Sequence, residues 1–276
     1  MMDASDTDLE WLHPTLDRCR QLIARVDDIQ RWTKLDSDGR REPVTEIDLA
    51  VDALLAEAIH GRIPDATILS EESNPDPAAF DADTVVVVDP IDGTDELAAG
   101  RPGYAVAVAL FHQRRPLASV LDMPAYDRRL TCRTGRGTFL NGRAVELSAL
   151  SDLSAANLAV SGTQYLRPDL KDFWASLPAA HLTPTPAFAA KVAAVLAGDV
   201  DAAVYLAVDP LTAAVWDYAA PAQLLEEAGG LLTDQHGTPL LDRAPTPHAD
   251  GWIAAPARLN KALIDFLASN PGVTDR

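Results

Sequence analysis

The segment Asp-Pro-Ile-Asp-Gly-Thr at residues 89–94 places two carboxylates three positions apart, directly after four consecutive valines. A run of valines is typical of a strand buried on both faces, so Asp89 and Asp92 come at the end of an apolar strand. Carboxylates that lie close together repel each other and are costly to bury unless positive charge lies between them. The spacing therefore predicts a cation shared at this strand end.

Other acidic residues occupy similar positions. Glu71 and Glu72 end a short predicted strand, and Asp217 lies at the start of a predicted helix. Asp48 lies in the first turns of another helix, which Thr45 can cap. Carboxylate oxygens, together with backbone carbonyls, suit Mg²⁺, and Mg²⁺ pairs naturally with phosphate oxygens. The pattern predicts a magnesium site that serves phosphoryl chemistry.

Gly93 and Thr94 follow the two aspartates directly. Glycine permits a close approach of the backbone, and the segment from residue 93 to 99 begins a short helix with free N–H groups. We therefore expect the amides of Gly93 and Thr94 to bind phosphate beside the metal. The simpler alternative is that Asp92, Thr94 and Asp217 only cap their helices or interact with the helix dipole.

The rest of the chain alternates between helical and strand patterns. Helices are predicted at residues 8–31, 46–63, 95–99, 167–177, 188–198, 215–230 and 257–269. Strands are predicted at residues 66–73, 84–89, 104–111, 116–124, 128–134, 138–147, 156–162, 201–208, 230–234 and 251–256. The polar stretch 32–45 is expected to be an exposed loop. We expect two α+β halves, residues 1–150 and 151–276, with Asp217 in the second.

Composition limits the classes of function. The chain has 276 residues and a formal net charge of −18, which argues against a general nucleic-acid or membrane-surface binder. Cys19 and Cys132 form neither a metal-binding pattern nor a disulfide framework. The N-terminus does not read as a signal peptide, and no apolar run is long enough for a membrane span. We expect a cytoplasmic protein with no nucleic-acid or membrane partner.

Four motifs in order resemble the inositol monophosphatase superfamily. They are PVTEID (43–48), SEES (70–73), DPIDGT (89–94) and WDYAA (216–220), and the segments 226–240 and 251–256 extend the likeness. The family comprises Mg²⁺-dependent, Li⁺-sensitive phosphomonoesterases with a layered αβαβα sandwich fold, which fructose-1,6-bisphosphatase-type enzymes share. The resemblance implies that α/β fold here, a small phosphate ester as substrate, and a homodimer.

The resemblance also implies a ligand set for two or three Mg²⁺ ions. Glu71 and the carbonyl of Ile91 match ligands of the first metal, Asp89 matches the aspartate that bridges two metals, and Asp92 and Asp217 match ligands of the second.

Catalytic roles are implied in the same way. Thr94, with Asp48, matches the pair that orients and deprotonates the attacking water. Glu72 is placed among the catalytic residues beside the metal ligands, and Lys34 matches a lysine near the site. The implied mechanism is in-line attack by a metal-activated water, with no covalent phosphoenzyme.

The substrate-selecting residues are less defined. Family members that act on inositol phosphate carry a glutamate shortly before the WD motif, whereas this chain has a longer segment with Asp209. Ser161 lies near the end of a predicted strand and is a candidate substrate contact. Lys191 lies on an apolar helix, where it either contacts a substrate phosphate or extends its ammonium to solvent. We expect a phosphorylated sugar, cyclitol or inositol as substrate.

Four alternatives remain open. Phosphatases of 3′-phosphoadenosine 5′-phosphate share LSEES and a lysine like Lys191, but have Lys-Glu where this chain has Asp95 and Glu96. Histidinol-phosphate phosphatases of the superfamily have Arg or Lys there. A non-catalytic relative that binds sugar phosphate would have no need of Asp48 with Thr94. A fructose-1,6-bisphosphatase-like enzyme would carry a basic effector cluster, and none is apparent.

Overall fold

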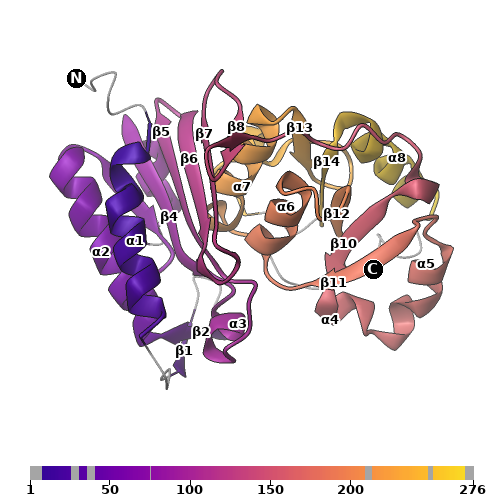
Figure 1. The fold of residues 1–276 in the computed structure, drawn as a ribbon, viewed down its shortest axis with the longest axis horizontal. Coiled ribbons are helices and arrows are strands. Elements are labelled where there is room, and N and C mark those ends of the chain that lie inside the picture. The colour runs from indigo at the N-terminus through magenta and orange to yellow at the C-terminus, as the bar shows by residue number, and fades with distance from the viewer. Residues whose placement is uncertain are drawn as a thin grey trace.

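The computed structural model describes residues 8–25, 31–35, 41–74, 76–208, 213–247 and 251–270. Five layers follow one another in Figure 1: paired helices, a large sheet, a second pair of helices, a smaller sheet, and outer helices. The helices are α1 (His13–Ile23) and α2 (Glu46–Arg62), then α6 (Phe188–Leu196) and α7 (Val215–Glu227), then α5 (Lys171–Ser176) and α8 (Ala257–Ala268). The expected αβαβα sandwich is confirmed.

The larger sheet has seven strands in the order β3-β4-β5-β6-β7-β8-β9. They are β3 (Thr67–Ser70), β4 (Thr84–Asp92), β5 (Ala105–His112), β6 (Arg115–Met123), β7 (Arg128–Arg133), β8 (Thr138–Leu140) and β9 (Arg143–Ala144). β4 is the second strand of this sheet and pairs parallel with the edge strand β3 and antiparallel with β5.

The valine run of β4 is buried on both faces, as predicted. Val86 and Val88 join the core under α1 and α2, whereas Val85 and Val87 join the core shared with α7. Successive side chains of a strand point to opposite faces, so each face of this strand is apolar. β4 is therefore anchored on both sides, and its end holds a fixed position.

The smaller sheet has five strands in the order β11-β10-β12-β14-β13. They are β10 (Asn157–Ser161), β11 (His181–Thr185), β12 (Ala202–Tyr205), β13 (Gly230–Thr233) and β14 (Trp252–Pro256). A short helix, α4 (Gly162–Tyr165), follows β10. The sequence did not predict β11, because it is a partly exposed edge strand that contains Pro184, and proline is tolerated at sheet edges.

The prediction of a loop at residues 32–45 is wrong for the part that the structure describes. β1 (Arg31–Leu35) and β2 (Arg41–Thr45) form an antiparallel pair that runs directly into α2. Ion pairs tie the first strand down, because Arg31 contacts Asp95 and Lys34 contacts both Glu71 and Glu72. Long-range charge pairing, rather than an apolar period, thus orders this polar segment.

The N-terminal helix is shorter than predicted, since α1 begins at His13, with Pro14 in its first turn, and ends at Ile23. The larger sheet ends at Ala144 and the smaller begins at Asn157. The division into 1–150 and 151–276 stays a prediction. In the parts of the chain that the structure describes, no helix is both long and apolar enough to span a bilayer.

Candidate active site

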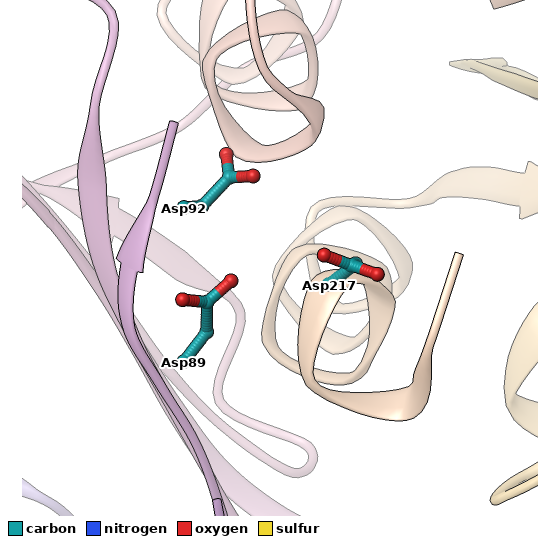
Figure 2. A group of neighbouring side chains, drawn as sticks. All are labelled: Asp89, Asp92 and Asp217. Atoms are coloured by element: carbon teal, nitrogen blue, oxygen red, sulfur yellow. The ribbon is translucent and has the colours of Figure 1, made fainter. Parts of the chain in front are cut away.

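Three carboxylates meet between the end of β4 and the start of α7 (Figure 2). Asp89, Asp92 and Asp217 each offer an oxygen, and these atoms lie within 4.8 Å of one another. The pairing of β4 with β5 shifts register between Asp89 and Asp92, which interrupts the regular alternation of the strand. The predicted carboxylate cluster at this strand end is therefore present.

Asp89 differs from the other two aspartates in the surroundings of its carboxylate. Its side chain is 1% exposed, yet neither carboxylate oxygen has a hydrogen-bond partner. Burial, together with the charges of Glu71, Asp92 and Asp217, raises the pKa of Asp89 well above its ordinary value. A buried carboxylate without donors is costly, and a divalent cation among these oxygens would compensate it. Hard oxygen donors of this kind fit Mg²⁺.

Helix starts hold the other two carboxylates. The N–H groups of Phe188 and Ala189, in the first turn of α6, donate to Asp92 over 3.3 and 2.7 Å. Burial raises the pKa of Asp92, and these two amides and the charge of Lys191 oppose the rise. Asp217 accepts a 2.5 Å hydrogen bond from the amide of Ala214 at the N-cap of α7. Both carboxylates are thus oriented before any metal binds.

Glu71 lines the same cavity as the three aspartates but is paired with a lysine. The ammonium of Lys34 donates to Glu71 over 2.9 Å and to Glu72 over 2.6 Å. Burial lowers the pKa of Lys34, but the two carboxylates outweigh it and raise the pKa overall, so the lysine stays charged. Burial and the charge of Glu71 raise the pKa of Glu72 to about 7, against the hydrogen bond from Lys34. Lys34 thus contacts Glu71, which lines the cavity, and a contact between this lysine and substrate stays a prediction.

Asp48 and Thr94 form a buried hydrogen-bonded pair. The hydroxyl of Thr94 lies 2.8 Å from Asp48 Oδ1 and 3.2 Å from the carbonyl oxygen of Ile91. A hydroxyl carries one proton, and the charged acceptor at the shorter distance is favoured. Thr94 is the first residue of α3 (Thr94–Ala98), so the pair lies beside the carboxylate cluster. The predicted contact between these two residues is present.

A cavity of about 670 Å³ opens onto this cluster. Its walls combine the acidic residues with hydroxyls and backbone from the smaller sheet. The lining residues are Pro43, Glu71, Asp89, Ile91, Asp92, Gly93, Thr94, Asp95, Glu96, Ser161, Gly162, Thr163, Pro184, Thr185, Pro186, Ala187, Lys191 and Asp217. Ser161 and Lys191 thus face the same space as the predicted metal ligands. Asp209 lies outside the described residues.

Gly93 is required at its position by the backbone. Its φ is +89°, and a Cβ there would lie 3.1 Å from both the Cβ of Ala187 and the carbonyl oxygen of Gly103. Only glycine adopts this conformation without strain and leaves room for both neighbours. The turn between Asp92 and Thr94 therefore depends on this residue.

Lys191 is 4% exposed, so its ammonium does not extend to solvent, and that alternative is wrong. The ammonium donates to the carbonyl of Ala187, whose φ is +51°, and lies 5.7 Å from the centre of the Trp252 ring. Burial lowers the pKa of Lys191 to about 8, with the charge of Asp92 opposing. A contact between this lysine and substrate stays a prediction.

Sequence reasoning missed the α6 amides that hold Asp92, because they lie almost a hundred residues further along the chain. It assigned Thr45 only as a helix cap, although the cap also contacts Asp48. The spacing Thr-x-x-Asp is that of a capping box and could have indicated the second contact.

The architecture and site define an αβαβα sandwich with a buried carboxylate cluster that could hold a metal ion. A family model for the inositol monophosphatase family matches residues 16–269, and the chain belongs to this family. "Nus factor SuhB" of Escherichia coli is 29% identical over 241 residues, covering 82% of this chain and 87% of that protein. "Inositol monophosphatase" of Dictyostelium discoideum is 28% identical over 217 residues, covering 75% and 77%. A solved IMPase/NADP phosphatase complexed with Mg²⁺ and phosphate has the same fold, with a TM-score of 0.77, 17% identity and 93% coverage of both chains.

Proposed function

We propose that this protein is a Mg²⁺-dependent phosphomonoesterase that hydrolyses a small phosphorylated alcohol: a sugar, cyclitol or inositol phosphate. The observation that carries the proposal is the buried carboxylate of Asp89, which has no donor and lies among further carboxylates. Family membership supports phosphatase chemistry, and the solved relative with Mg²⁺ and phosphate supports the choice of metal.

Two or three Mg²⁺ ions would be held by the carboxylates of Glu71, Asp89, Asp92 and Asp217 and by the carbonyl of Ile91. When bound, the metal would lower the pKa of a coordinated water and stabilise the departing ester oxygen. Lys34 would keep Glu71 and Glu72 in place and balance part of their charge. The negative charge of the cluster is what makes the metal necessary.

Asp48 and Thr94 would act as the base for the attacking water. The water donates a hydrogen bond to the Thr94 oxygen, while the Thr94 hydroxyl proton points to Asp48 Oδ1. As the water oxygen bonds to phosphorus, its proton passes to Thr94 and the Thr94 proton passes to Asp48. The phosphorus–oxygen bond to the leaving group breaks in line, the departing alkoxide takes a proton from solvent water, and Asp48 returns its proton to solvent. The amides of Gly93 and Thr94 would hold the phosphate.

The cavity wall opposite the carboxylates suits a polyhydroxylated leaving group. The hydroxyl residues Ser161, Thr163 and Thr185 line the cavity, as does Lys191. Asp95 and Glu96 on the near side are acidic and disfavour a second phosphate there. This balance favours a neutral sugar or cyclitol over a bisphosphorylated nucleotide. From the family resemblance we also expect a homodimer that Li⁺ inhibits, and from the cysteine content we expect a cytoplasmic location.

Phosphate release from a substrate panel tests the proposal. The panel contains inositol phosphates, sugar phosphates, histidinol phosphate and 3′-phosphoadenosine 5′-phosphate, each with Mg²⁺, with EDTA, and with Mg²⁺ plus Li⁺. We expect Mg²⁺-dependent, Li⁺-inhibited release from a sugar, cyclitol or inositol phosphate. Release from the nucleotide or histidinol phosphate alone would correct the substrate class. If the protein bound Mg²⁺ and sugar phosphate but released no phosphate from any compound, it would be a binding protein rather than an enzyme.

A further inference from the structure

The residue that caps the helix of Asp48 also binds the Asp48 carboxylate. Thr45 precedes α2, and its backbone N–H donates to Asp48 Oδ2 over 3.0 Å. Its hydroxyl contacts the same oxygen. The other oxygen of this carboxylate, Oδ1, accepts from Thr94. Both Thr45 and Asp48 are almost fully buried, at 0% and 1% exposure, so water does not compete for these contacts.

The direction of the Thr45 hydroxyl bond follows from its other contacts. The same oxygen accepts from the N–H groups of Ile47, over 3.2 Å, and of Asp48, over 3.5 Å. A threonine hydroxyl has two lone pairs and one proton. Since amides can only donate, its single proton is directed at Asp48 Oδ2. Asp48 Oδ2 therefore receives two donors from Thr45.

Two donors on one oxygen fix the rotation of the carboxylate about its χ2 bond. Oδ2 is turned toward Thr45, and Oδ1 is turned toward the Thr94 hydroxyl. Rotation of the carboxylate would break both bonds from Thr45 inside the protein, which is costly for buried groups. The cap thus fixes the orientation in which the second carboxylate oxygen faces the Thr94 hydroxyl.

We propose that the Thr45 hydroxyl is a positioning residue for catalysis: it holds Asp48 so that Oδ1 stays ready to receive the Thr94 proton. Thr45 is not among the residues that line the cavity, and its hydroxyl donates to Asp48, so its effect passes through Asp48. The inference rests on the proposed phosphatase reaction and goes beyond the role of Thr45 as a helix cap.

A purely structural cap and a positioning residue differ in what they change. Removal of a cap lowers the free energy of unfolding and leaves the turnover of the folded enzyme unchanged. Loss of positioning lowers kcat, leaves KM nearly unchanged, and requires Asp48 to be present. These outcomes can be measured separately.

The first comparison is of Thr45→Val with Thr45→Ser. Valine keeps the shape and removes the hydroxyl, so kcat is expected to fall about 10- to 100-fold, the scale of a lost hydrogen bond to a charged group. Serine keeps the hydroxyl and is expected to retain kcat within about threefold. Thr138→Val is the matched control, because Thr138 is also buried and bonds the carbonyl of Leu224. Its loss is expected to leave kcat unchanged.

A double-mutant cycle with Asp48→Asn tests whether the effect of Thr45 on kcat passes through Asp48. If Thr45 acts through Asp48, Thr45→Val/Asp48→Asn turns over as slowly as Asp48→Asn alone. A full additional loss in the double variant would overturn the proposal, as would wild-type kcat in Thr45→Val. If Thr45→Val does not fold, Thr45→Ala takes its place in the same cycle. A wild-type protein that hydrolyses nothing would instead contradict the phosphatase function itself.

Discussion

The N–H of Ala189 donates a 2.7 Å hydrogen bond to Asp92 Oδ2, and this bond joins α6 to the end of β4 at the carboxylate cluster. Asp92 ends β4 of the larger sheet, whereas Ala189 lies in the first turn of α6, next to the smaller sheet. Asp217 comes from a third element, the start of α7. A cation among these carboxylates would therefore hold β4 and α7 together, and its affinity would depend on how these elements are packed.

Replacement of Asp89 is expected to raise the stability of the metal-free protein and to abolish turnover. Asp89→Asn removes one negative charge from a buried cluster, so the metal-free protein is expected to gain about 1–2 kcal/mol in free energy of unfolding at neutral pH. Turnover is expected to disappear, because the cluster loses a carboxylate that would hold the metal. Chemical denaturation in EDTA and phosphate release in Mg²⁺ measure the two effects. A lower free energy of unfolding for Asp89→Asn than for the wild type would show that the charge of Asp89 is already balanced in the metal-free protein.

The stabilisation by Asp89→Asn is expected to depend on pH. The folded-state pKa of Asp89 is raised, so the folded protein binds a proton that the unfolded chain releases. The associated stability is present below the unfolded value of about 4 and is lost as pH rises. The variant should therefore gain little over the wild type near pH 4 and most near pH 8. An equal gain at both values would contradict the raised pKa.

Thr94→Ala removes the hydroxyl between the water and Asp48. We expect kcat to fall by about 10²-fold or more, with little change in KM, because a general-base interaction contributes on that scale. Steady-state kinetics on the substrate identified by the panel measure both constants. Thr94→Ser, which keeps a hydroxyl, is the control and should retain most of the activity. A rise in KM alone would assign Thr94 to binding instead.

Lys191 is expected to give a pH dependence of stability opposite in sign to that of Asp89. Burial lowers its pKa from 10.5 to about 8, so the unfolded chain binds more protons between these values. The free energy of unfolding of the metal-free protein should then rise from pH 8 to pH 10.5, by up to about 3 kcal/mol relative to Lys191→Met. Denaturation curves of both proteins at these pH values test this. If the free energy of unfolding changed equally with pH in both proteins, this would show that burial does not lower the pKa of Lys191.

Most of the site could be predicted because its signals are local. The valine run, the turn at Gly93 and the pair Asp89 and Asp92 all lie within one strand and its end. The carboxylate of Asp217 was placed by its helix start together with the family resemblance. Local sequence is enough where each residue's role follows from its own element.

The remaining features depend on contacts between distant segments. The amides that hold Asp92 come from α6, and the pairing of Lys34 with Glu71 orders a strand that shows no apolar period. The burial of Lys191 depends on Trp252, in the last strand of the smaller sheet. No local pattern reports such contacts, because charge pairing and packing are decided only once the sheets are assembled.

The central claim, metal-dependent hydrolysis at the Asp89 cluster, is tested most directly by the Mg²⁺ dependence of phosphate release. The assay compares wild type, Asp89→Asn and the control Thr138→Val on one substrate, from EDTA to saturating Mg²⁺. We predict no release in EDTA, a saturable rise with Mg²⁺ for wild type and Thr138→Val, and no release at any Mg²⁺ concentration for Asp89→Asn. Release that persists in EDTA, or normal turnover by Asp89→Asn, would contradict the account.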